Sequence, residues 1–187
     1  MNRRKVLVET LPVLFLCVLG GSLAGFFLGS MADIFEIIPG LIVIVPAIID
    51  MRGNICSALG SRLGSAMHLG LLDEGLTSDV TNENFKGTMS LSVFVSLVIP
   101  LFLFLTSMFL PITISPRAIM VIALISITTG VTSAVVLLLV TFGIIAFSIK
   151  FNIDPDNISG PVLTTVGDIA TLIILFGFAT LFGGLFL

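Results

Sequence analysis

One acidic residue near the C-terminus stands where an ionised side chain is costly. Asp168 follows Thr164 and Thr165 inside a long apolar segment, and no other charged residue separates it from the C-terminus. A carboxylate at bilayer depth is expensive and is therefore a candidate functional group. If the segment is helical, Thr164 and Asp168 project from one face, with Thr171 within about 60° of Asp168. The spacing predicts a short stripe lined by oxygen atoms.

A second polar stripe is predicted in the apolar region 37–72. If this region is one helix, a set of polar and small residues falls within about 40° of one direction: Asp50, Asn54, Ser57, Ser61, Gly64 and His68. Small residues alone favour close helix packing in a membrane, whereas Asp50 and Asn54 favour a hydrated path. Arg52 and Arg62 point away from this stripe.

The available ligand atoms predict which ion such stripes could bind. Carboxylate, amide and hydroxyl oxygens suit a hard cation such as Mg²⁺, Ca²⁺ or Mn²⁺, whereas copper and structural zinc prefer sulfur and imidazole. Cys17 and Cys56 both lie in apolar stretches, so we expect them to pack there, with no disulfide, metal cluster or thiol chemistry. Mg²⁺ is commonly held by one or two carboxylates with its waters kept. The single Asp168 carboxylate of one chain is a small number of ligands for a divalent ion. A two-fold homodimer with the ion near its axis would supply two such carboxylates.

The composition defines the environment of these residues. Hydrophobic residues make up 57% of the 187 residues and charged residues only 10%, and the mean hydropathy is +1.25. Soluble domains carry about 25% charged residues, so we expect an all-α, multi-pass protein of the cell membrane in contact with the lipid bilayer. Residues 1–187 are expected to form a single transmembrane cation-transport domain. The scattered basic residues and net charge of −3 exclude a nucleic-acid partner.

The apolar runs predict five transmembrane helices. They cover approximately residues 6–30, 37–72, 88–110, 118–149 and 161–187. The second run would be about 54 Å long as a straight helix, against a hydrocarbon core of about 30 Å. It must therefore tilt, project or break, with Pro39, Pro46 and Gly53 as candidate break points. The fourth run is expected to be one tilted helix. Residues 73–87 form a loop or short surface helix, and residues 150–159 a turn-rich linker.

The charges flanking these runs predict the topology. With a cytoplasmic N-terminus, the outside holds Arg117 alone, and the cytoplasmic segments hold the other basic flanking residues: Arg3, Arg4, Lys5, Lys86 and Lys150. This bias favours a cytoplasmic N-terminus and a C-terminus outside. A cleaved signal peptide is the alternative for the first run, which is too long for one and is followed by four more spans. The small-residue spacings Gly21, Gly25, Gly29 and Gly60, Gly64 are expected to let helices approach closely.

Two stretches resemble the membrane domain of the MgtE family of magnesium channels. The last helix of the family is matched by Asp154-Pro155, Ser159-Gly160-Pro161, Thr164-Thr165 and Asp168. The second helix is matched by Pro46, Gly53-Asn54 and Ser61-Arg62-Leu63. This second stretch is closer still to the eukaryotic solute-carrier relatives, which carry two such five-helix units in one chain. The resemblance covers essentially the whole sequence.

The resemblance implies a Mg²⁺-permeable dimer in which Asp168 is the pore aspartate. Thr164 and Thr165 would lie nearby, and Gly53-Asn54 would supply the motif of the second helix. The bacterial channels have a glycine-rich stretch where this sequence has Asp50-Met51-Arg52, so the resemblance does not supply Asp50. Its role as a second pore acid is inferred from its position alone. We expect no counterpart of the cytoplasmic sensing domain of those channels, and therefore no gating by such a sensor.

Several alternatives remain open from the sequence. Transport could be passive and driven by the membrane potential, or coupled to H⁺ or Na⁺ through Asp50, Glu9 or His68. The chain could instead be a non-transporting accessory subunit, and Asp168 could pair with Arg52 or Arg62. The second half of the dimer could also be non-identical. No catalytic set predicts an enzyme. The acidic stretches 73–83 and 154–157 are expected to be a solvated loop and a turn with a helix cap.

Overall fold

The computed structural model describes residues 3–71, 79–109, 114–151 and 155–184. Within these residues the elements are α1 (Arg3–Gly29), α2 (Ala32–Ile37), α3 (Leu41–His68), α4 (Asp79–Ser107), α5 (Pro116–Phe151) and α6 (Pro155–Gly183). The predicted all-α class is confirmed. By length and composition, five of these helices could cross a membrane, all except α2, which confirms the predicted number of candidate spans.

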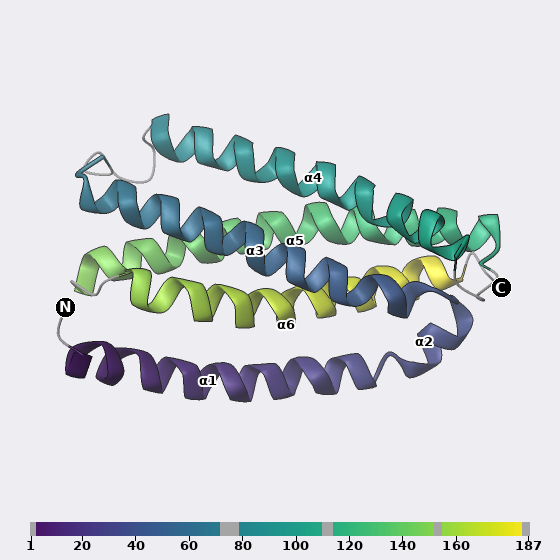
Figure 1. The fold of residues 1–187 in the computed structure, drawn as a ribbon, viewed down its shortest axis with the longest axis horizontal. Helices are drawn as coiled ribbons and strands as arrows, with labels where there is room; N and C mark the ends of the chain where they lie inside the picture. The colour runs from purple at the N-terminus through teal and green to yellow at the C-terminus, as the bar shows by residue number, and fades with distance from the viewer. Residues whose placement is uncertain (1–2, 72–78, 110–113, 152–154, 185–187) are drawn as a thin grey trace.

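The five long helices form one elongated bundle, with α6 packed against α3, α5 and α1 (Figure 1). Helix α4 lies on α3 and α5. The largest apolar core joins α3, α5 and α6 and includes the fully buried Leu41, Ile122 and Ala179. The start of α1 and the end of α6 lie at opposite ends of the bundle in Figure 1, as an odd number of spans requires.

Helix α1 is the least buried of the long helices, with 11% of its most apolar window buried against 33% or more for the others. It approaches α6 closely at Gly20, where an added Cβ would collide with the Thr165 methyl group. Gly21 and Gly25 have open space beside them, so this chain does not use their spacing for its own packing. The side chain of Glu9 lies outside the described residues.

Gly40 forms the junction between α2 and α3. Its φ of +94° is in the left-handed region that favours glycine, and α3 begins at the next residue. The break predicted near Pro39 is therefore confirmed. Pro46 and Gly53 lie inside the continuous α3, because a single missing backbone donor in the second turn does not end a helix that packs on three neighbours, α4, α5 and α6.

Gly40→Ala is expected to lower the free energy of unfolding by about 1–2 kcal/mol, the usual cost of a left-handed conformation for a residue with a Cβ. The new methyl group would also lie 2.9 Å from Ile114 Cδ1. Thermal unfolding in detergent, followed by circular dichroism, checks this. Gly87→Ala is the control, since a Cβ added at Gly87 would have nothing within 4 Å. Equal unfolding midpoints for the two variants would contradict the role of Gly40.

Two helix starts differ from the prediction. Helix α4 begins at Asp79, well before the apolar run that starts near residue 88, and a Lys86 Nζ–Glu83 Oε1 ion pair of 2.9 Å lies in its polar first turns. Helix α6 begins at Pro155, since proline suits the first turn of a helix, so Ser159 is helical and not part of a linker. Asp73, Glu74 and Asp154 lie outside the described residues. The single helix predicted near residues 118–149 is confirmed by α5.

Candidate cation site

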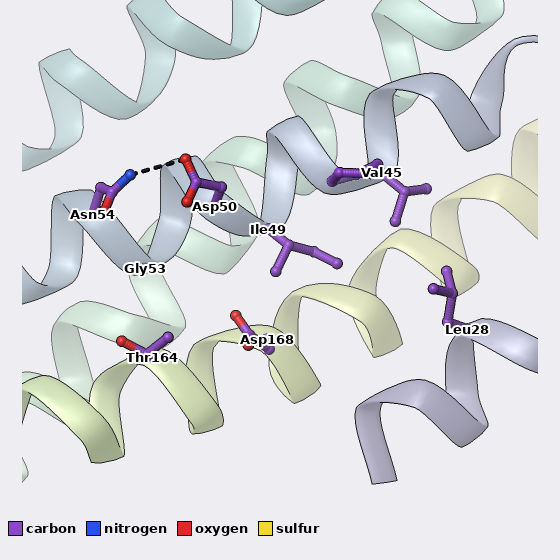
Figure 2. Close-up of a pocket in the computed structure, with 9 residues that line it drawn as sticks. Leu28, Val45, Ile49, Asp50, Gly53, Asn54, Thr164 and Asp168 are labelled. Atoms are coloured by element: carbon purple, nitrogen blue, oxygen red, sulfur yellow. Dashed lines mark hydrogen bonds between the residues drawn. The ribbon is translucent and has the colours of Figure 1, made fainter. Parts of the chain in front are cut away.

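A cavity of about 430 Å³ lies between α3 and α6, next to the end of α1. Its lining consists of Leu28, Val45, Pro46, Ile49, Asp50, Gly53, Asn54, Thr164 and Asp168. Figure 2 shows the polar side chains of α3 on one side and those of α6 on the other. The structure thus brings together five of the six residues that the sequence predicted for the site: Asp50, Gly53, Asn54, Thr164 and Asp168.

Helix α6 supplies a carboxylate and a hydroxyl group one turn apart. Asp168 lies about midway along α6 and is partly buried. Among the described residues, no hydrogen bond or ion pair occupies its carboxylate. Thr164 Oγ1 donates to Gly160 O at 3.0 Å, and a hydroxyl oxygen that donates can still accept. Both groups can therefore act as oxygen ligands toward the cavity.

Helix α3 supplies a second carboxylate, oriented by an amide one turn away. Asn54 Nδ2 donates to Asp50 Oδ2 at 3.0 Å, the dashed line in Figure 2. This bond leaves Asp50 Oδ1 and Asn54 Oδ1 available as acceptors. Gly53 lies between them and faces Thr164 of α6, where an added Cβ would be at an ordinary contact distance of 3.5 Å from Thr164 Cγ2.

Thr165, the sixth predicted residue, lies outside the cavity lining. Its hydroxyl donates to Pro161 O at 3.0 Å, and its methyl group faces Gly20 of α1. The helical rotation of 100° per residue separates it from Thr164, and α1 covers the face on which it lies. Thr171 is also outside the lining and is fully buried.

The two arginines of α3 lie away from Asp168. Arg52 is fully buried on the face toward α4, where its Nη2 donates to Ser96 Oγ at 3.1 Å and Ser92 O at 3.4 Å. Arg62 is exposed. In the described part of the chain neither arginine forms an ion pair with Asp168, so nothing there supports the structural pairing that the sequence left open. His68 is exposed at the end of α3, outside the cavity lining.

The apolar part of the lining was not predicted. Val45 and Ile49 continue the cavity along α3, and Leu28 reaches it from α1. Their hydrophobicity gives no signal in a sequence where most residues are apolar. Only the four-residue spacings of Pro46 from Asp50 and of Ile49 from Gly53 could have suggested a shared face.

The lining suits a hydrated hard cation. Two carboxylates, an amide oxygen and a hydroxyl group are ligands that Mg²⁺, Ca²⁺ and Mn²⁺ accept. Within the residues that the structure describes, no group of three or more His, Cys, Asp or Glu side chains gathers to hold a metal. A bare ion would lack ligands here, whereas the cavity volume leaves room for an ion that keeps several waters.

Comparisons with known proteins place this architecture in a family. Residues 45–178 match the family model MgtE, described as a divalent cation transporter. Solute carrier family 41 member 2 of Xenopus laevis is 28% identical over 152 residues, which are 76% of this chain and 26% of the relative. Solute carrier family 41 member 3 of Rattus norvegicus is 26% identical over 175 residues, which are 88% of this chain and 36% of the relative.

The chain therefore spans about a quarter to a third of the length of these curated relatives. No solved structure matches it. The family match includes all residues of the cavity lining except Leu28, and it confirms the resemblance found in the sequence. The chain belongs to the MgtE family of divalent cation transporters.

Proposed function

We propose that this chain conducts Mg²⁺ passively across the cell membrane through the cavity between α3 and α6. The observation that carries the proposal is the convergence of Asp50 and Asp168, from two separate candidate spans, on one cavity that also holds Asn54 and Thr164. The same oxygen ligands would admit Ca²⁺ or Mn²⁺. A membrane potential of about 100 mV supplies about 4.6 kcal/mol for inward movement of a doubly charged ion.

We propose a two-fold homodimer as the conducting unit. One chain brings two acidic side chains to the cavity, and a second copy would double this number around a shared path. The curated relatives are longer than this chain, so a non-identical second half is the alternative. The bias of positive charges supports a cytoplasmic N-terminus and a C-terminus outside.

Mg²⁺ uptake into proteoliposomes that contain a chelating dye tests the proposal. The potential is fixed with a K⁺ gradient and valinomycin, with no pH or Na⁺ gradient, and protein-free liposomes serve as the control. We expect uptake that increases with the inside-negative potential. Uptake that begins only with an imposed H⁺ or Na⁺ gradient would favour a coupled exchanger. Absence of uptake under all three conditions would favour an accessory subunit.

Asn54→Ala is expected to slow Mg²⁺ uptake about 5- to 10-fold. The variant removes the amide that orients the Asp50 carboxylate. This exposed hydrogen bond is expected to contribute about 1–1.5 kcal/mol, within the usual net range for a hydrogen bond in a protein. The initial rate in the proteoliposome assay measures this. Ser57→Ala, on the same helix but outside the cavity lining, should keep the wild-type rate. If both variants transport equally, Asn54 does not contribute to the path.

A further inference from the structure

A buried cation lies beside the cation cavity, on the side of α3 that faces α4. Arg52 is fully buried, although it is next to Gly53 in the sequence. Its Nη2 donates to Ser96 Oγ and Ser92 O of α4, whereas Nε and Nη1 have no hydrogen-bond partner. A guanidinium group carries five N–H donors, of which these two nitrogens hold three. Buried donors without a partner are costly, the more so on a charged group.

Hydroxyl groups without partners lie on the two neighbouring helices. Ser92 Oγ of α4, and Ser126 Oγ and Thr129 Oγ1 of α5, are buried and have no hydrogen-bond partner. Gly130 brings α5 to the guanidinium group, because a Cβ at this glycine would lie 3.1 Å from Arg52 Nη2. Thr129 is adjacent to Gly130 and Ser126 is one turn before it, so both belong to the same stretch of α5. We call these residues the arginine cluster: Arg52, Ser92, Ser96, Ser126 and Thr129.

No carboxylate of the described residues neutralises this cluster. Asp168 lines the cavity between α3 and α6. Asp50 lines the same cavity and also the groove between α3 and α4, but no described acid forms an ion pair with Arg52. A charge buried without a counter-charge in a membrane protein costs several kcal/mol, so such groups are normally paired. Water could satisfy the free N–H donors of Arg52, but water carries no charge to offset the guanidinium.

We propose that the arginine cluster binds a small monovalent anion of the halide class, with chloride as the abundant candidate. Its free groups are guanidinium N–H donors and hydroxyl groups, which together donate to an anion. The residues of the arginine cluster are all buried between packed helices, which favours a monatomic ion over a carboxylate or phosphate. A bound anion would offset the positive charge behind Asp50, so that Arg52 does not weaken the attraction of the cavity for cations.

The ³⁵Cl line width in the presence of purified wild-type protein in detergent tests this proposal. We expect excess broadening that added bromide removes and that gluconate at equal ionic strength does not. Arg52→Met should abolish the bromide-sensitive broadening. Arg62→Met is the matched control, because Arg62 is an exposed arginine of the same helix, and it should keep the broadening. Ser126→Ala combined with Thr129→Val should weaken bromide competition while leaving the charge in place.

Either of two outcomes would overturn the proposal. Absence of bromide-sensitive broadening in the wild-type protein, at every temperature from 10 °C up to the start of unfolding, would mean that only water occupies the cluster. The temperature series excludes slow exchange of a bound ion as the cause, and the result does not depend on whether any variant folds. Equal broadening in folded Arg52→Met and Arg62→Met proteins would mean that the anion binds elsewhere. The measurement involves no cation transport, so it remains decisive whether or not Mg²⁺ flux is found.

Discussion

Asp168→Asn is expected to lower Mg²⁺ flux by about 100-fold or more while the helical fold is retained. Coulomb attraction between a divalent ion and one carboxylate near 4 Å is about 8 kcal/mol at an effective dielectric constant of about 20. Much of this attraction is offset by the cost of removing water from the ion, and the other ligands of the cavity remain in the variant. A residual loss of about 3 kcal/mol corresponds to the 100-fold effect. Asparagine has nearly the same shape, so the variant removes charge without creating a cavity.

Asp33→Asn is the matched control for this variant. Asp33 is an exposed acid of the short α2, outside the candidate spans and the cavity lining, and its loss should leave the rate of Mg²⁺ uptake unchanged. Circular dichroism and size-exclusion chromatography show whether each variant is folded before its rate is compared. A folded Asp168→Asn protein with the wild-type rate would remove Asp168 from the transport path.

Gly130→Ala is expected to destabilise the protein by about 3 kcal/mol, at the upper end of the usual cost of overpacking. The added Cβ would lie 2.8 Å from Ser96 Cβ and would also collide with Ser96 Oγ. Ser96 cannot yield without moving α4 or breaking its bond with Arg52. The variant therefore opens the contact between α4 and α5 beside a buried charge, and the midpoint of thermal unfolding should fall.

Gly143→Ala on the same helix is the control for Gly130→Ala. It shows what replacing a glycine of α5 by alanine does where no steric collision follows. A Cβ added at Gly143 would have nothing within 4 Å, and alanine favours a helix over glycine by about 1 kcal/mol. Its midpoint should equal or exceed that of the wild type. If Gly130→Ala unfolds at the same temperature as Gly143→Ala, the close contact at Gly130 does not exist.

The number of candidate spans followed from the sequence because the apolar runs are long and clearly separated. The helix starts did not, since hydropathy marks where a helix becomes apolar and not where its hydrogen bonding begins. At α4 the polar turns from Asp79 carry the Lys86–Glu83 ion pair ahead of the apolar run. At α6 the helix starts at Pro155, because proline is well suited to a first turn.

The polar members of the cavity were predictable because carboxylates and amides are rare and costly inside a membrane. Asp50, Asn54 and Asp168 stood out for this reason, and they line one cavity. Thr164 lines the cavity and Thr165 does not, because different neighbouring helices cover the two faces of α6 on which they lie. That assignment requires the position of α1, since Gly20 faces Thr165, and no local pattern in the sequence specifies it.

The most direct measurement asks whether the cavity itself carries the ion. Asn54→Cys is placed in a background in which Cys17 and Cys56 are alanine and Mg²⁺ uptake is retained, and a positively charged methanethiosulfonate reagent is added to the proteoliposomes. Modification should block uptake, Mg²⁺ should slow the modification, and dithiothreitol should restore the rate. Asp33→Cys in the same background should be modified without any block. Complete modification of Asn54→Cys with undiminished Mg²⁺ uptake would contradict passage of the ion between α3 and α6.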